Sequence, residues 1–329
     1  LLASRMRFAG QPLPAAFAKV LAQADYSSVD AGERAQLRRH FQLIPDHWPV
    51  AALTRQHDAG DAAHSSWLRV DPAHVAPDMG GARMLSHGDA LALTTDDVAQ
   101  LLPALKPLFG DAGFALDAPH PSRWYLRLPK EAKLPVFAAP DEVLGEDLFV
   151  HLPEGDLGRR WRALLTETQV VLHNHPWNAR RVAAGKPAVN SLWFWGAGAP
   201  PEFVRTRYKQ VKGKDIVLRA LAGAAGVVEA GGDTNSQEVD ALVDLRPLRV
   251  LDKLANDAVQ PLLQAVRTRE LECLTLDFED GAIFVLRRDQ RWRFWRRPLS
   301  PRERNCRSAA FTLAARSAFR RKAMIAARA

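Results

Sequence analysis

Residues 158–198 read GRRWRALLTETQVVLHNHPWNARRVAAGKPAVNSLWFWGAG, and this stretch decides the fold class. Its first part, residues 158–173, carries large apolar side chains at three- and four-residue spacing, which predicts a helix that Pro176 ends. Its last part, residues 189–195, has large side chains on both faces, which is typical of a strand inside a sheet. A long helix followed by a buried strand predicts a mixed α/β protein.

The flanking sequence extends this pattern in both directions. Residues 274–278 and 282–286 flank Glu279-Asp280-Gly281 and predict a β-hairpin near the C-terminal end. Further helices are predicted over residues 31–43, 95–110 (with Thr95 as N-cap) and 256–269. Further strands are predicted over residues 67–70, 90–93, 123–128, 216–218, 241–245 and 291–296.

Composition divides the chain into three parts. Residues 1–64 are predicted to be an irregular N-terminal segment, and residues 65–300 an α/β body. A stretch rich in proline and acidic residues, 129–156, is a candidate boundary between two subdomains of that body. Residues 301–329 are predicted to be a basic tail, disordered or weakly helical.

The net charge of +8 comes from the C-terminal end. Residues 287–329 hold 14 Lys and Arg against two acids, so the 31 Lys and Arg and 35 Asp and Glu of residues 1–286 leave a net charge of −4. A basic end of this kind either binds nucleic acid or an anionic membrane or is a solvated appendage. No aromatic platform or recognised binding module accompanies the charge, so we expect neither specific nucleic-acid recognition nor a membrane partner.

Cysteine content and hydropathy bear on the compartment. Cys273 and Cys306 are the two cysteines, and their separation fits neither a CxxC motif nor a zinc site, so we expect a reducing compartment. No stretch approaches about 18 uninterrupted apolar residues, and the first residues do not resemble a signal peptide. We expect a cytoplasmic protein.

Common catalytic motifs do not identify an active site, because GxSxG, GxxxxGK[ST] and HExxH are all missing from the sequence. The densest group of polar side chains follows the long helix. If this group faces a cleft, it would hold a small phosphorylated or anionic ligand, with Arg181 as a forked donor and the asparagines as neutral donors. The predicted ligand-binding residues are His173, His175, Asn178, Arg181, Lys186, Asn190, Trp195, Gly196 and Gly198.

A structural interpretation of the same residues stays open. His173 and His175 would lie about 200° apart on one helix and could not share a ligand there. Trp193 and Trp195 point to one side of a strand and Phe194 to the other, which equally suits the core of a sheet.

Three motifs in this region resemble the archaeal-type, cofactor-independent phosphoglycerate mutases. They are His173-x-His175-Pro176-x-Asn178-x-x-Arg181, Gly185-Lys186-Pro187-Ala188-x-Asn190 and Leu192-Trp193-Phe194-Trp195-Gly196-x-Gly198. The resemblance implies that helix, strand and a Gly-x-Gly turn surround one pocket. It also implies that Asn178, Arg181 and Asn190 converge near that turn, either on a substrate or on loop carbonyls.

Roughly residues 65–298 also resemble a proteobacterial family of RpfE-like regulatory proteins. Pro119-His120-Pro121-Ser122-Arg123-Trp124-Tyr125-Leu126 and the strand ending at Gly198 carry this resemblance. The mutases belong to the alkaline-phosphatase-like superfamily, so the resemblance implies a mixed-sheet α/β sandwich, followed here by the C-terminal hairpin. It further implies that active relatives use two divalent metals and a Ser or Thr nucleophile.

The sequence departs from the mutase pattern at three places. Asp58-Ala59-Gly60-Asp61 only partly matches the Asp-Gly-x-x-Asp metal signature, and no histidine follows His175 to supply the later metal ligands. Trp195 occupies the position where the mutases offer an arginine. We therefore predict no catalytic metal pair and no cofactor.

Three functions remain as hypotheses. The first is a regulatory, non-catalytic relative of the mutases that binds a small anionic ligand, with a protein partner left open. The second is an active phosphoglycerate mutase or phosphatase with displaced metal ligands, which would need divalent metal. The third is a nucleic-acid-associated protein that acts through its basic C-terminal end.

Overall fold

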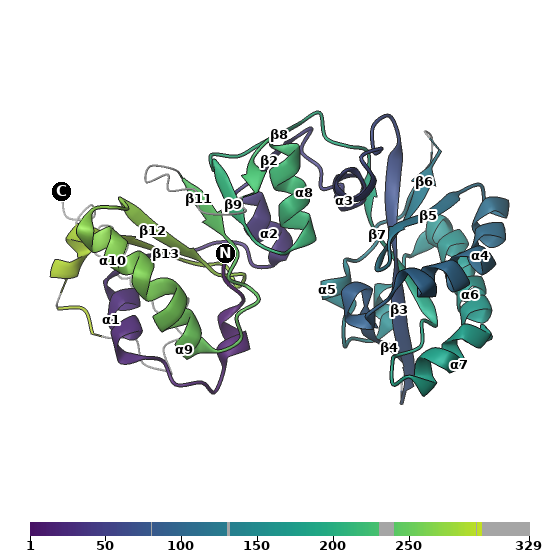
Figure 1. Cartoon of the computed structure of the whole chain (residues 1–329), viewed down its shortest axis with the longest axis horizontal. Helices are drawn as coiled ribbons and strands as arrows, with labels where there is room; N and C mark the ends of the chain where they lie inside the picture. Colours follow the sequence, from purple (N-terminus) through teal and green to yellow (C-terminus); the bar gives the residue numbers. More distant parts are fainter. Residues whose placement is uncertain (80, 130–131, 230–239, 294, 298–329) are drawn as a thin grey trace, which may run out of the picture. The chain divides into compact units, whose positions relative to one another are not determined.

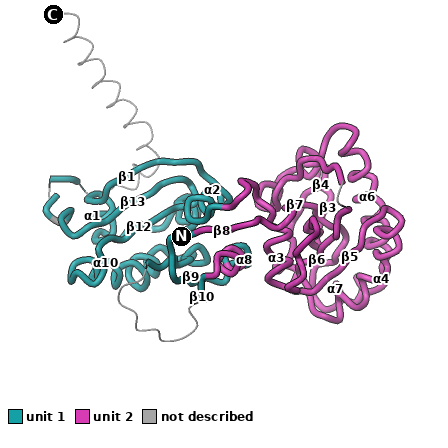
Figure 2. Tube along the Cα trace, turned by 90° about the horizontal axis from the view of Figure 1, so that it is seen from above, with its two compact units in different colours: residues 1–42, 206–218, 227–329 teal, residues 43–205, 219–226 magenta. Residues whose placement is uncertain are grey.

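The computed structural model describes residues 1–79, 81–129, 132–229, 240–293 and 295–297 (Figure 1). The chain forms two compact units, shown in separate colours in Figure 2. Unit 1 comprises residues 1–42, 206–218 and those from 227 onward, and unit 2 comprises residues 43–205 and 219–226. Unit 2 is thus mainly one continuous stretch inserted into the sequence of unit 1.

A five-stranded antiparallel sheet forms the centre of unit 2. Its longest strand, β3 (Ser66–Asp78), pairs with β6 (Arg123–Leu128) and β7 (Ser191–Gly198) along its first half. The second half of β3 pairs with β4 (Gly81–His87), and β5 (Ala115–His120) pairs with β6. Strand β3 is therefore the strand on which the sheet is built.

Helices cover both faces of this sheet (Figure 1). Because successive strand residues point to opposite faces, Leu68 and Val70 of β3 pack with α4 (Thr95–Asp111) and α6 (Gly155–His173) in the main core. Trp67 points to the other face, where it packs with Ala51 and Ala52 of α3 (Val50–Ala59). Polar residues of β3 share this second face.

Shorter elements complete unit 2. They are the 3-10 helices η2 (Gly88–Leu91) and η3 (Leu148–His151), helices α5 (Pro140–Val143) and α7 (Pro176–Ala183), and strand β8 (Phe203–Arg205). Two elements lie where the chain passes from one unit to the other: β2 (Gln42–Ile44), which pairs with β8, and α8 (Ile216–Ala224).

Unit 1 contains an antiparallel sheet in the order β1-β13-β12 and a small parallel sheet in the order β10-β9-β11. Apolar residues of β12, β13, α1 and α10 share one core. The strands are β1 (Asp25–Ser28), β9 (Gln210–Lys212), β10 (Val228–Glu229), β11 (Ala241–Val243), β12 (Cys273–Asp277) and β13 (Ala282–Arg287). The helices are η1 (Arg5–Phe8), α1 (Ala15–Gln23), α2 (Glu33–Arg38), α9 (Leu251–Lys253), π-helical η4 (Leu254–Val259), α10 (Gln260–Thr268) and η5 (Arg288–Trp292).

The architecture confirms a mixed α/β protein, but two details of the predicted fold differ. The five-stranded sheet of unit 2 is antiparallel throughout, whereas β9 pairs in parallel with β10 and β11 in unit 1. Residues 1–64, predicted to be irregular, hold α1, β1, α2, β2 and α3. Their pattern is weak because β1 and α1 depend on the distant β13 for a partner.

The domain boundaries also differ from the predicted ones. Residues 129–156 belong to unit 2, and their described part holds α5, η3 and the start of α6. The division instead falls near residues 42 and 205, where no change of composition marks it. The predicted tail, 301–329, lies outside the described residues.

Several local predictions were wrong. Thr94, not Thr95, caps α4, in a reciprocal capping box with Asp97. Residues 90 and 91 end η2 and residues 92 and 93 follow it, and residues 216–218 begin helix α8. The hairpin is confirmed, but its sheet takes β1 as third strand, and η5 occupies the start of the stretch for which a strand was predicted. Among the described helices, none combines the length and apolar character needed to cross a membrane.

Candidate functional site

Asn178 lies on α7 with its amide group buried, and it binds the protein's own backbone. Its Nδ2 donates to the carbonyl oxygens of Leu172 and Val189 at 2.7 and 2.9 Å, and its Oδ1 accepts from Val189 N at 2.8 Å. These bonds tie the end of α6 to the segment before β7. Asn178 is a structural residue in this arrangement, because three of its hydrogen bonds go to main-chain groups.

Arg181, one turn further along α7, is also enclosed. Its Nε donates to Pro187 O at 3.0 Å and its NH2 to Leu91 O at 2.7 Å. Its NH1 forms an ion pair with Asp97 Oδ2 at 2.7 Å, and the two side chains are only 2% and 5% exposed. Burial opposes the ionisation of Asp97, but hydrogen bonds from Arg181, Trp177 and Thr94 outweigh it and lower the Asp97 pKa to about 2.

The side-chain amide of Asn190 forms hydrogen bonds with the main chain of strand β3. Its Oδ1 accepts from Val75 N at 2.8 Å and its Nδ2 donates to Val75 O at 2.7 Å, so the amide imitates a paired strand residue. Nearby, His74 Nδ1 lies 2.9 Å from Ala188 O. The side chain of Asn190 therefore extends the pairing of β3 before β7 begins.

The three predicted cations or imidazoles are spread along α7. His173 is exposed at the end of α6, and His175 caps α7, where its Nδ1 accepts from Trp177 N at 3.2 Å. Lys186 follows the other end of α7, whose 8 residues span about 12 Å. A single phosphate group could not reach both ends of the helix.

Trp195, Gly196 and Gly198 lie at the far end of β7, about 20 Å along the strand from Asn190. The predicted Gly-x-Gly turn is part of the strand: Gly196 has φ +67° at a bulge where two β7 residues face one of β3. A Cβ on Gly196 would lie 3.0 Å from Val50 Cβ, and one on Gly198 would lie 2.7 Å from Pro49 Cβ. Both glycines make room for the start of α3.

The predicted site residues therefore form two groups rather than one. Asn178 and Arg181 are buried and bind the segment that precedes β7. Gly196 and Gly198 adjoin the start of α3, and Trp195 near them binds Asp71. Asn178, Arg181 and Asn190 bind loop and strand main chain, as one of our two interpretations expected. They lie before the start of β7, however, and not near the Gly196–Gly198 turn where the resemblance placed them. Whether any of these residues holds a ligand stays a prediction.

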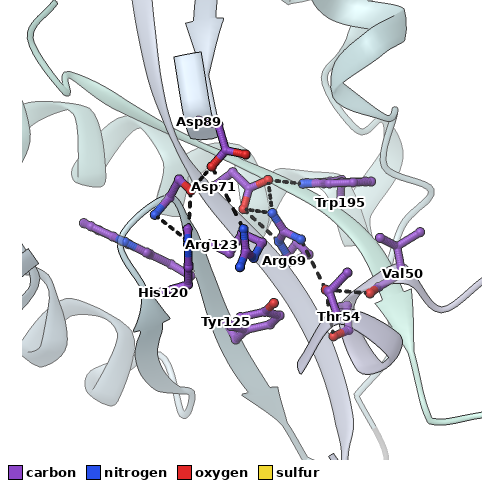
Figure 3. Close-up of polar contacts among 12 residues, drawn as sticks. Val50, Thr54, Arg69, Asp71, Asp89, His120, Arg123, Tyr125 and Trp195 are labelled. Carbon is purple, nitrogen blue, oxygen red and sulfur yellow. Dashed lines mark hydrogen bonds and ion pairs between the residues drawn. The ribbon is translucent and has the colours of Figure 1, made fainter. Parts of the chain in front are cut away.

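A second polar group, which the sequence analysis did not single out, lies on the α3 side of the sheet (Figure 3). Arg69 and Asp71 of β3 are 3% and 1% exposed and form a two-pronged pair with both N–O distances at 2.8 Å. Arg69 NH1 donates to Thr54 Oγ1 at 3.2 Å, and Trp195 Nε1 donates to Asp71 Oδ2 at 2.8 Å. The guanidinium lies between the rings of Tyr125 and Trp195, 5.4 and 5.2 Å from their centroids.

The neighbouring strand β6 supplies a second buried pair. Arg123 donates from Nε and NH2 to the two oxygens of Asp58, both at 2.7 Å, and Tyr125 donates to Asp58 at 2.6 Å. Burial opposes the ionisation of Asp58, yet these bonds keep its pKa below the ordinary value. Burial and the Asp58 charge raise the pKa of Tyr125, although Arg69 opposes the shift.

Asp89, Ser122 and His120 lie at one side of these pairs. The Ser122 hydroxyl donates to Asp89 Oδ1 in a short hydrogen bond and lies 3.0 Å from His120 Nδ1. Burial, together with the charge of Arg123, lowers the pKa of His120. Burial also lowers the pKa of His87, whose buried Nδ1 has no hydrogen-bond partner among the described residues.

A sequence signal for this group existed. Arg69 and Asp71 alternate with Leu68 and Val70, so the two charged residues share one face of their strand. Arg123 belongs to the same face, although its strand was predicted to have a wet side. Charged residues at alternate positions of two paired strands therefore predict ion pairs as well as a solvated face.

The acids of the partial metal signature bind arginine and tyrosine side chains. Asp58 binds Arg123 and Tyr125, and Asp61 binds Arg55 Nε at 2.5 Å. In the part of the chain that the structure describes, no three His, Cys, Asp or Glu side chains are grouped so that they could hold a metal ion. The predicted lack of a metal pair remains a prediction.

Comparison with known proteins identifies distant relatives. No protein-family profile matches the chain. It is 30% identical over 144 residues to the 2,3-bisphosphoglycerate-independent phosphoglycerate mutase of Methanosarcina mazei, covering 44% of this chain and 34% of that protein. It is also 30% identical over 135 residues to a probable mutase of the same type from Geobacter sulfurreducens, covering 41% and 33%.

Two solved structures align with this chain at low TM-scores. A cofactor-independent phosphoglycerate mutase from Thermoplasma acidophilum aligns over 84% of this chain and 82% of its own, with a TM-score of 0.36 at 15% identity. A protein from Pyrococcus horikoshii aligns over 84% and 80%, with a TM-score of 0.42 at 14% identity.

The chain is a distant relative of the archaeal-type cofactor-independent phosphoglycerate mutases over part of its length. The matched part spans about a third of the length of the curated relatives.

Proposed function

We propose that this chain is a regulatory, non-catalytic relative of the cofactor-independent phosphoglycerate mutases, similar to the RpfE-like proteins, and that it binds a small anionic ligand. The observation that carries the proposal is that the polar side chains of the mutase-like motifs bind other groups of the protein. These side chains form hydrogen bonds with main-chain atoms, and one of them also forms an ion pair with Asp97; they belong to Asn178, Arg181 and Asn190. In this proposal the motif residues stabilise the fold and do not bind a substrate.

Arg181 shows why this favours a non-catalytic role. An arginine that serves a phosphoryl group must present its fork of N–H donors to that group. Here Nε and NH2 donate to main-chain oxygens at 3.0 and 2.7 Å, and NH1 lies 2.7 Å from Asp97 Oδ2 in an ion pair that lacks hydrogen-bond geometry. Freeing the guanidinium would leave Asp97 without its cation in a buried place, which is costly. At the other end of β7, Trp195 donates to Asp71 where the mutases offer an arginine.

The test combines turnover with binding. Purified protein is assayed for interconversion of 2- and 3-phosphoglycerate with added Mn²⁺, its metal content is measured by elemental analysis, and 3-phosphoglycerate is titrated by calorimetry. We expect binding without turnover and no stoichiometric metal. Turnover that a chelator abolishes would overturn the proposal in favour of an active mutase with displaced ligands, and a lack of binding would remove the anionic ligand from it.

A further inference from the structure

The loop between β5 and β6 places Ser122 beside a partly free arginine. Arg123 uses Nε and NH2 for Asp58, which leaves NH1 directed at Asp89, 4.0 Å from Asp89 Oδ1. The same Asp89 oxygen accepts the Ser122 hydroxyl. Figure 3 shows Asp89 facing Arg123, with His120 on another side of that arginine. The Asp89 carboxylate thus accepts a hydrogen bond from Ser122 and faces NH1 of Arg123.

Asp89 differs from the other acids of this group in its exposure. Its side chain is 79% exposed, whereas those of Asp58 and Asp71 are 4% and 1% exposed. A 4.0 Å ion pair of an exposed carboxylate contributes at most about 1 kcal/mol, because water competes for the charge. The carboxylate of Asp89 can therefore leave Arg123 at small cost, and an oxygen of the ligand would replace it as acceptor of the Ser122 hydroxyl, while the two buried pairs stay intact.

One imidazole adjoins this place and a second lies two residues before Asp89 in the sequence. Ser122 N donates to His120 Nδ1 at 3.3 Å, so a neutral His120 carries its hydrogen on Nε2. His87, on the other flank of Asp89 in the sequence, keeps a buried Nδ1 that lacks a partner among the described residues. A buried polar atom without a partner is costly unless a ligand or water completes it.

We propose that Asp89 is an internal stand-in for the oxyanion group of a small ligand, a phosphate monoester or a carboxylate, which replaces it at the Ser122 hydroxyl and Arg123 NH1. This inference rests on the proposed function, because it assigns a place to the anionic ligand. That place is distinct from the predicted residues around α7. The exchange keeps an oxyanion at the Ser122 hydroxyl and Arg123 NH1, since one anionic group leaves and another takes its position.

The test removes the Asp89 carboxylate, which competes with the ligand, and in a separate variant the Ser122 hydroxyl, which would donate to the ligand. Inorganic phosphate and, separately, acetate are titrated into the full chain by calorimetry, with Asp89→Ala, Ser122→Ala and Asp156→Ala variants beside the wild type. Asp156 is a matched control, because its side chain is 95% exposed on α6 and its removal changes the net charge equally. We expect Asp89→Ala to bind the preferred anion at least about threefold more tightly, from the loss of a surface ion pair. Ser122→Ala should weaken binding, and Asp156→Ala should leave it unchanged.

The outcomes separate this inference from the proposed function. Binding that responds to neither Asp89→Ala nor Ser122→Ala would overturn the site while the anionic ligand stands. An equal gain in Asp89→Ala and Asp156→Ala would reduce the effect to net charge and also overturn it. If no variant binds either anion, both the site and the anionic ligand are rejected. Mutase turnover would affect only the non-catalytic part of the proposed function.

Discussion

Replacing Arg181 by methionine should destabilise unit 2, because it leaves the buried Asp97 without its cation. Removing one partner of a buried ion pair costs about 3–5 kcal/mol. Asp97 keeps donors from Thr94 and Trp177 at 2.8 and 2.7 Å, so we expect about 3 kcal/mol for Arg181→Met. Loss of the bonds to Leu91 O and Pro187 O is included in this figure.

The acid dependence of stability offers a second readout of the same substitution. The Asp97 pKa is about 2 in the folded chain against 3.8 as the ordinary value, which corresponds to at most about 2 kcal/mol at neutral pH. Because the folded pKa is the lower one, this stability is present above pH 4 and is lost as the pH falls from about 4 towards 2. In Arg181→Met the Asp97 pKa should return towards its ordinary value, and this part of the acid-induced loss should shrink.

Urea unfolding followed by tryptophan fluorescence, at pH 7 and pH 3, measures both effects. Arg180→Met is the matched control, since Arg180 is an exposed neighbour on the same helix that contacts the Trp177 ring, 5.3 Å from its centroid. It should change the free energy of unfolding by less than about 1 kcal/mol. The reasoning fails if Arg181→Met stays within about 1 kcal/mol of wild type at pH 7, or if it removes ligand binding while stability is unchanged.

Three more outcomes follow from the structure and the sequence. Gly196→Ala should lower the melting temperature, because the left-handed backbone (φ +67°) and a Cβ 3.0 Å from Val50 Cβ together cost about 1–3 kcal/mol. The control Gly110→Ala lies on α4, where nothing is within 4 Å of the new Cβ, and should not lower the melting temperature. Asn178→Leu should cost about 2–4 kcal/mol in urea unfolding, since main-chain groups of Leu172 and Val189 lose their partner, and a smaller loss would contradict its structural role. Ending the chain at Ser300 should take the net charge from +8 to +1 and leave the melting temperature unchanged. In the full chain, DNA binding should disappear as salt rises in a filter assay, and sequence-selective binding at physiological salt would show that the tail has a specific role.

Local periodicity was sufficient for elements that carry their own apolar stripe. The helix predicted over residues 158–173 is α6, and the hairpin around Asp280-Gly281 is β12 and β13. Both depend on neighbours within a few residues, so their pattern is visible in one stretch of sequence. The helix α3 was missed, because its pattern of small residues and a left-handed Gly60 after it resembles a loop.

The candidate site could not be assembled in the same way. The alternation of Leu68, Arg69, Val70 and Asp71 shows that two charges share a face, but not that α3 covers it. Gly196 was predicted at a turn because glycine is common there, whereas its reason is the approach of Val50 from a distant segment. Contacts between residues more than a hundred positions apart leave no periodic trace in a single sequence.

The insertion of unit 2 within the sequence of unit 1 has a consequence for biosynthesis. Strand β1 emerges from the ribosome early, but its partner β13 begins only at Ala282. At about 5–20 residues per second, residues 206–287 take some 4–16 seconds to add after unit 2 is mostly complete. Nascent unit 2 can thus close around β3 while the first 42 residues wait with their apolar side chains uncovered, the interval in which a holding chaperone would matter most.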